Sequence, residues 1–145
     1  MNIPWYVTAL GAALVWGIHY PLVDFALKRV SVYSVLLLTV MPVLLLMPLF
    51  LREVARDLEV VRALPAAEQG MIAAIGLTSV FGAVLLYLSI AGKNATLASL
   101  IEITYPVFVA FFAYLMFRHI HLNASVIVGG LLVIAGAGLI IYNNQ

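Results

Sequence analysis

Glu102 is the residue whose surroundings most strongly suggest chemistry. It is the only ionisable carboxyl or amine in the apolar run from residue 95 to residue 117. A charge at the centre of a membrane helix costs about 2.5–3.5 kcal/mol on insertion scales, so a functional role is the default expectation. Pro106, four residues later, has no amide hydrogen for the carbonyl of Glu102, which leaves a free acceptor beside the carboxylate. The pair predicts a site that binds a proton or an organic cation in turn, and competition between the two would give exchange.

A second group of polar and aromatic residues lies near the N-terminus. Trp16, Tyr20 and Asp24 recur at four-residue spacing, with His19 one position aside, so a helix would present them as a stripe on one face. His19 could relay protons with Glu102, because histidines inside membranes often serve as proton relays, although a structural histidine bonded to a backbone carbonyl is the more common case. For Asp24, a surface ion pair with Lys28 is favoured over a place on the transport pathway.

Three tyrosines could supply aromatic walls for an apolar or cationic substrate. Tyr105 follows Glu102 by three residues, which places both on one face of a continuous helix. Tyr87 and Tyr114 are possible pathway residues, but membrane-interface anchoring or core packing explains them at least as well. The predicted substrate and coupling residues are therefore Glu102, His19, Trp16, Tyr20 and Tyr105.

Small residues mark one face of the last apolar stretch. Ser125, Gly129 and Gly136 form a groove in which another helix could approach closely, and Gly130 and Ala137 repeat the pattern alongside. This face could form a dimer contact or pack within the chain.

Other chemistries find little support in the sequence. His119 and His121 are two residues apart, which does not place them on one helical face, so no metal site is predicted. The chain has no cysteine, which excludes disulfides and thiol chemistry. No nucleophile and base stand at a spacing that suggests an enzyme, and no cofactor motif is present. A net charge of +1 gives no basic surface for nucleic acid.

These residues must be positioned by membrane helices. The chain has 145 residues, of which 66% are hydrophobic and 9% charged, a composition that excludes an ordinary soluble domain. About 20 apolar residues cross the hydrocarbon core as a helix. The predicted class is an all-α membrane protein with one domain of five transmembrane helices, over residues 4–27, 32–51, 69–90, 95–117 and 124–142.

The only sizeable connection, residues 52–68, alternates apolar and charged residues at helical spacing. It is either an amphipathic helix on the membrane surface or a solvated connector.

Charges in the loops are nearly balanced between the two sides of the membrane. The seven basic residues divide into three on the side of the C-terminus and four on the side of the N-terminus: Lys28, Arg29 and Lys93, against Arg52, Arg56, Arg62 and Arg118. An excess of Lys and Arg normally fixes the cytoplasmic side. The balance permits insertion in both orientations and an antiparallel homodimer, whereas a single orientation fixed by a partner is the alternative.

The Pro-centred run from residue 95 to 114 and the glycine-rich run from 128 to 138 follow each other in order, and Trp16 and Gly17 precede them. This chain resembles the EamA-type module of the drug/metabolite transporter superfamily. The resemblance implies a half-transporter, because most members carry two such modules with the second inverted. The chain departs from the family in two places. Many modules have an acidic residue after the fourth helix, where this chain has the segment Arg118 to His121, and many have an arginine in the second helix, where this chain has none.

We therefore expect a multi-pass protein of the inner or plasma membrane that transports small metabolites or drug-like compounds. Its expected partners are a small-molecule substrate, membrane lipid and a second copy of the chain, in an antiparallel homodimer with alternating access and coupling at Glu102. The alternative is an accessory membrane subunit that forms a pathway only with a different partner chain.

Overall fold

The computed structural model describes residues 3–118 and 123–144. Within them every regular element is a helix, as predicted. The elements are α1 (Trp5–Leu27), α2 (Val32–Leu46), the 3₁₀ helix η1 (Met47–Phe50), α3 (Leu51–Ala63), α4 (Ala66–Gly92), α5 (Ala95–Glu102), α6 (Tyr105–Phe117) and α7 (Ala124–Asn143). Five helical stretches in this part of the chain are long and apolar enough to cross a membrane.

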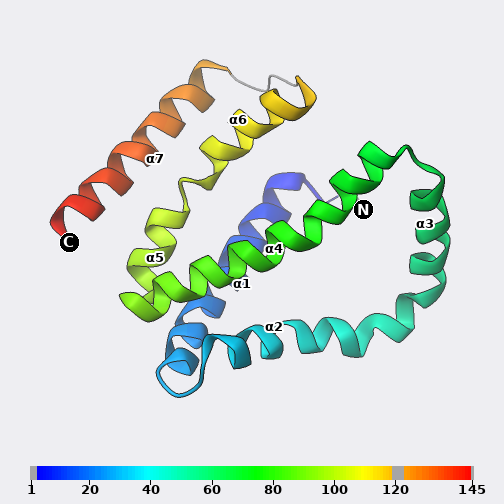
Figure 1. The fold of residues 1–145 in the computed structure, drawn as a ribbon. Coiled ribbons are helices and arrows are strands. Elements are labelled where there is room, and N and C mark those ends of the chain that lie inside the picture. Colours follow the sequence, from blue (N-terminus) through cyan, green and yellow to red (C-terminus); the bar gives the residue numbers. More distant parts are fainter. Residues whose placement is uncertain (1–2, 119–122, 145) are drawn as a thin grey trace. The chain divides into compact units, whose positions relative to one another are not determined.

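The chain forms two compact units, which are described separately. The first contains Met1–Leu22 and Gly92–Gln145, and the second contains Val23–Ala91. In the first unit, α7 runs back past α6 in the opposite direction (Figure 1). They come close at Gly130, where an added Cβ would lie 3.4 Å from Val107 Cγ2.

Asparagine and serine side chains begin three of the helices, as their positions before apolar runs predict. The backbone amides of Ser34, Leu97 and Val126 donate to the side chains of Ser31, Asn94 and Asn123, respectively. Each bond satisfies one of the first-turn amides that a helix leaves without a partner.

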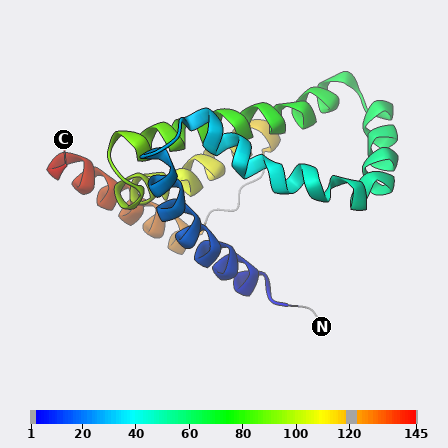
Figure 2. The same cartoon turned by 90° about the horizontal axis from the view of Figure 1, so that it is seen from below.

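In the second unit, α3 joins the far ends of α2 and α4 (Figures 1 and 2). After α2, the helix tightens into η1 at Pro48. Tyr87 on α4, only 2% exposed, shares a hydrogen bond of 2.9 Å with Thr39 on α2. Polar groups in hydrocarbon need a partner of this kind, so the bond ties the two helices together.

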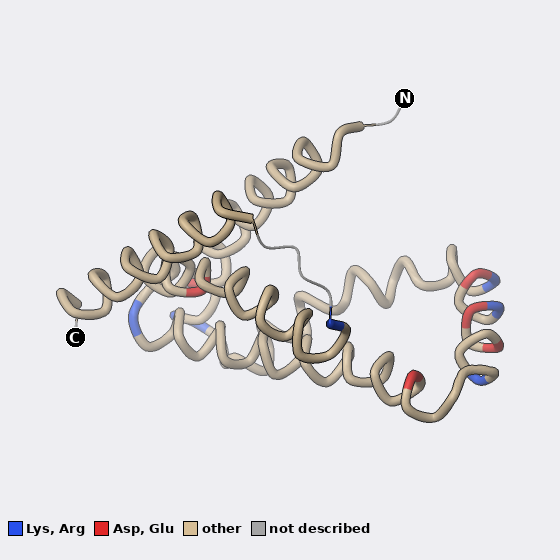
Figure 3. The backbone as a smooth tube through the Cα atoms, turned by 90° about the horizontal axis from the view of Figure 1, so that it is seen from above, with Lys and Arg blue, Asp and Glu red and all other residues tan. Residues whose placement is uncertain are grey.

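The connection predicted over residues 52–68 contains the helix α3. Basic and acidic residues are mixed along this helix, whereas most of the remaining backbone carries no charge (Figure 3). The apolar residues at helical spacing are Leu51, Val54, Leu58 and Val61. This pattern suits a helix that lies between lipid and water.

The stretch predicted as a helix over 95–117 is one of the five candidate spans, and the structure shows an interruption within it. α5 ends at Glu102 and α6 begins at Tyr105. Pro106 cannot supply an amide to the turn before it, so the regular bonding pattern stops there. Thr104 compensates in part, because its hydroxyl donates to the carbonyl of Ile101 at 2.9 Å.

Candidate functional site

Tyr20 and Glu102 form the central contact of the candidate site. The Tyr20 hydroxyl donates to Glu102 Oε2 over 2.7 Å, and both residues are partly buried. They are 82 residues apart in sequence and belong to the same compact unit. Hydrogen bonds to a charged acceptor are shorter and stronger than those between neutral groups, which fits this distance. The structure thus joins two of the residues predicted to form the site.

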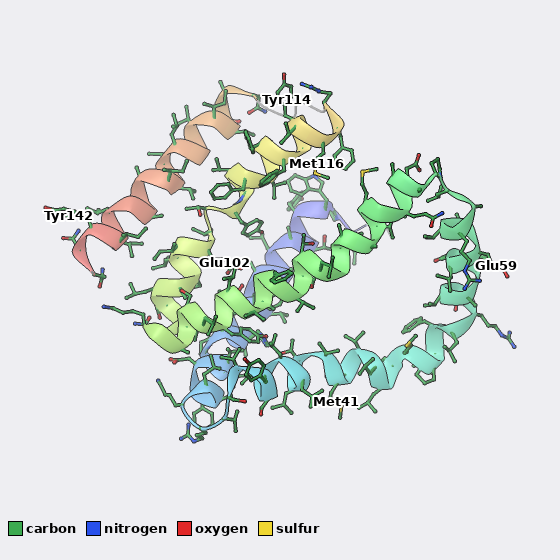
Figure 4. All side chains as sticks on the ribbon, viewed as in Figure 1. Met41, Glu59, Glu102, Tyr114, Met116 and Tyr142 are labelled. Carbon is green, nitrogen blue, oxygen red and sulfur yellow. The ribbon has the colours of Figure 1, made fainter. Side chains whose placement is uncertain are left out.

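The end of a short helix positions the carboxylate. Asn94 caps α5, and Glu102 is its last residue before the break (Figure 4). α5 contacts α7, and the buried residues of these two helices are alanines: Ala95, Ala98 and Ala137. Small side chains let the two backbones approach closely. The position of Glu102 therefore depends on the packing of α5 and on the break that follows it.

A second contact holds the same region. Lys93, which precedes α5, donates from Nζ to the backbone carbonyl of Asn144 at 2.9 Å. A cation beside the C-terminal end of a helix is favourable, because the last carbonyls carry partial negative charge. This bond ties the start of α5 to the end of α7.

The rings of Trp16, His19 and Tyr20 lie next to one another on α1. The ring centroid of Trp16 lies 5.0 Å from that of His19 and 5.6 Å from that of Tyr20. The rings of His19 and Tyr20 are 6.2 Å apart. Three residues of the predicted stripe, Trp16, His19 and Tyr20, thus form a cluster, and Tyr20 contacts Glu102. The fourth, Asp24, pairs with Lys28 instead. Ring faces attract cations, so the cluster and the carboxylate favour the same kind of ligand.

Positive charge is sparse in this unit. Among its described residues, the only full positive charges are Lys93 and Arg118. Lys93 bonds to Asn144, and the Arg118 guanidinium lies 5.4 Å from the ring centroid of Tyr114. The hydrogen bond that the Glu102 carboxylate accepts comes from a neutral hydroxyl, so its charge is not balanced by an ion pair in the described region.

Two further candidates lie in the other unit. Asp24 forms the expected ion pair with Lys28 at 3.2 Å, and the Lys28 side chain is well exposed. Tyr87 is a buried packing residue bonded to Thr39. Sequence reasoning missed Thr39, although a polar residue three positions before Pro42 in an apolar stretch was a usable signal.

Tyr105 was expected on the same helical face as Glu102, which requires a continuous helix. The break at Ile103 and Thr104 interrupts that helix. Tyr105 is 59% exposed. Tyr114 lies at the far end of α6 (Figure 4), where it lines the edge of an apolar groove.

This groove, which we call the α6–α7 groove, has a volume of about 620 Å³. Its walls include Pro106, Phe111, Gly129 and Ile134, and neither Tyr20 nor Glu102 lines it. An apolar groove of this kind suits a lipid chain or another helix better than a polar substrate.

The two small-residue patterns on α7 separate in the structure. Ala137 is 5% exposed and Gly130 meets Val107, so this row packs within the chain. An added Cβ at Gly129 or Gly136 would have no neighbour within 4 Å. The face of Ser125, Gly129 and Gly136 is therefore open in the single chain.

Metal binding finds no support in the described residues. They contain no group of three or more His, Asp or Glu residues that could hold a metal ion. His119 and His121 lie outside the described residues.

Comparison with known families agrees with the resemblance found in the fourth and fifth stretches. The sequence model of the EamA-like transporter family matches residues 3–142 of the chain. The match confirms that resemblance and the expected all-α membrane class. No curated protein and no solved structure matches the chain.

Proposed function

Since the chain belongs to the EamA-like transporter family and is a multi-pass membrane protein rather than an enzyme, we propose that it is a secondary active transporter coupled through Glu102. The substrates are small metabolites or drug-like compounds, and the membrane is the inner or plasma membrane. Glu102 binds a proton or a cationic substrate in turn, and Tyr20, Trp16 and His19 line the site.

The observation that carries this proposal is the Tyr20–Glu102 contact of 2.7 Å at a break in an apolar span. Broken helices near the middle of the membrane supply substrate and ion sites in many secondary transporters, because irregular backbone is tolerated where it lines a cavity. An ionisable residue at such a break is suited to coupling.

We further propose that two copies assemble as an antiparallel homodimer. A chain with five spans has its termini on opposite sides, so an inverted second copy can replace the second module that most family members carry. The open face of Ser125, Gly129 and Gly136 and the adjoining α6–α7 groove support this assembly, because a neighbouring helix can approach closely there.

Vesicles loaded with a metabolite extract test coupling while the substrate is still unidentified. The purified protein is reconstituted, a pH gradient is imposed, and the compounds released are identified by mass spectrometry. We expect gradient-driven release of specific compounds by the wild type, and release at the level of protein-free vesicles for Glu102→Gln.

Glu59→Gln on α3 is the matched control, because Glu59 is exposed and far from Glu102 in sequence. It should transport like the wild type. Undiminished gradient-driven release by Glu102→Gln would overturn the coupling role.

A further inference from the structure

The Glu102 carboxylate already has a strong donor within the protein. The Tyr20 hydroxyl lies 2.7 Å from Oε2, at the distance of a charge-assisted bond. A ligand that uses this oxygen must therefore compete with a group of the protein itself.

The donor and the acceptor of this hydrogen bond belong to different helices. Tyr20 belongs to α1, next to Pro21, whereas Glu102 ends α5. α5 is fixed by its Asn94 cap and by contact with α7, and it is separated from α6 by the break. A small tilt of either helix would change the distance between the hydroxyl and the carboxylate without breaking a regular helical turn.

We propose that Tyr20 is an internal, displaceable ligand of Glu102, which orients the carboxylate and gives way when a substrate binds to the same oxygen. This inference rests on the proposed coupling role of Glu102. Tyr20 is a positioning residue: it occupies one oxygen of the carboxylate and keeps the group oriented until a better partner arrives.

The same geometry indicates a substrate class. A molecule that displaces the hydroxyl must bring a positive charge or a strong hydrogen-bond donor, because a neutral apolar compound cannot replace the lost bond. The rings of Trp16 and His19 beside Tyr20 favour an apolar or aromatic body around that charge. The fitting class is an organic cation with a substantial apolar surface.

Modification by dicyclohexylcarbodiimide tests the role of Tyr20 directly. This apolar reagent reacts with protonated carboxyl groups, and mass spectrometry of the Glu102 peptide gives the rate at that residue. Tyr20→Phe removes only the hydroxyl, so Glu102 should be modified about tenfold faster at constant pH, which corresponds to about 1.4 kcal/mol.

Two controls separate a local effect from a general loosening of the fold. Tyr142→Phe removes a hydroxyl from an exposed tyrosine on α7 and should leave the rate at Glu102 unchanged. The rate at Asp24 should be the same in Tyr20→Phe as in the wild type. Modification of Glu102 in Tyr20→Phe at the wild-type rate, or an equal acceleration at Asp24, would overturn the proposal.

The substrate class is tested with the wild type. Methyltriphenylphosphonium should slow modification of Glu102, whereas neutral triphenylmethane should not. Equal protection by both compounds would overturn the cationic class. These outcomes are separable from the transport test: if Glu102→Gln abolishes coupling while Tyr20→Phe reacts normally, only the role of Tyr20 fails.

Discussion

At the scale of single residues, one polar contact of the chain could take part in transport chemistry, whereas the others are structural. The Tyr20–Glu102 bond joins a neutral donor to a carboxylate in an apolar span. The Asp24–Lys28 pair joins two opposite charges one helical turn apart, with the lysine well exposed. Water screens the second contact much more than the first, so their energies should differ.

Asp24→Asn should therefore have little effect. We expect the free energy of unfolding to fall by less than about 1 kcal/mol, because exposed ion pairs contribute about 0.2–1 kcal/mol. Denaturant titration of the purified protein measures this, with Lys28→Gln as the matched partner. A loss of coupled transport in Asp24→Asn would instead place Asp24 on the pathway.

Trp16 offers an optical test of the candidate site. The chain has two tryptophans, Trp5 and Trp16, so Trp5→Phe leaves only the ring beside His19 and Tyr20. Methyltriphenylphosphonium should quench the fluorescence of Trp16 in a saturable way. In the double variant that also carries Glu102→Gln, the saturable part of the quenching should be lost. The variant Trp16→Phe, which retains Trp5, serves as the control for partition into lipid. Saturable quenching of Trp5 alone would contradict this assignment.

At the scale of helices, the sequence was sufficient for the five spans and their caps but not for the break in the fourth. Hydropathy locates apolar helices because length and composition decide whether a helix crosses the membrane. A proline alone does not predict whether a helix breaks, because Pro21 and Pro42 lie inside continuous helices whereas Pro106 follows a break.

The sequence also could not predict which helices contact each other. Four-residue spacing correctly placed Trp16, His19 and Tyr20 together, because these residues share one helix. It could not show that Tyr20 reaches Glu102 or that Tyr87 reaches Thr39, because those contacts depend on tertiary packing.

The contact between α2 and α4 should make a measurable contribution to stability. Tyr87→Phe removes the bond to Thr39, and polar contacts between membrane helices contribute about 0.6 kcal/mol on average and about 1.7 at most. Unfolding in a denaturing detergent should show a loss in this range. Tyr33→Phe, at an exposed position on α2, should be neutral. An equal loss in both variants would exclude a specific contribution from the Thr39 bond.

Glycines on the two faces of α7 should respond differently to a larger side chain. Gly130→Leu meets Val107 and should destabilise the chain by about 1–3 kcal/mol, the usual effect of overpacking. Gly11→Leu on α1, where nothing lies within 4 Å, should not. Thermal unfolding of the purified variants compares the two, and equal midpoints would contradict the close packing of α6 and α7.

Gly136→Leu tests the open face. We expect it to leave the fold intact and to reduce cross-linking between copies, because a leucine keeps a neighbouring helix from approaching. Chemical cross-linking in vesicles measures the dimer fraction, and Gly11→Leu is again the control. A full dimer yield in Gly136→Leu would move the interface to another face.

At the scale of the whole molecule, orientation in the membrane decides whether two copies can assemble in opposite directions. The absence of native cysteine makes a single introduced thiol a clean reporter. In Gln145→Cys, a membrane-impermeant thiol reagent added to sealed vesicles should label about half of the chains, because the balanced loops do not fix one orientation. Labelling of nearly all or none would favour a parallel assembly or a different partner chain.

The helix α3 has a consequence for the membranes that can accept this chain in either direction. It carries three basic residues, Arg52, Arg56 and Arg62, and three acidic residues, Glu53, Asp57 and Glu59, so its formal charge is zero. The cytoplasmic leaflet of many membranes is rich in anionic lipid and has a negative surface potential, which attracts polybasic segments at about 1 kcal/mol per cation. A helix with no net charge gains almost nothing from that potential. It can therefore rest on either leaflet at nearly equal free energy, so lipid asymmetry leaves both orientations of the chain open.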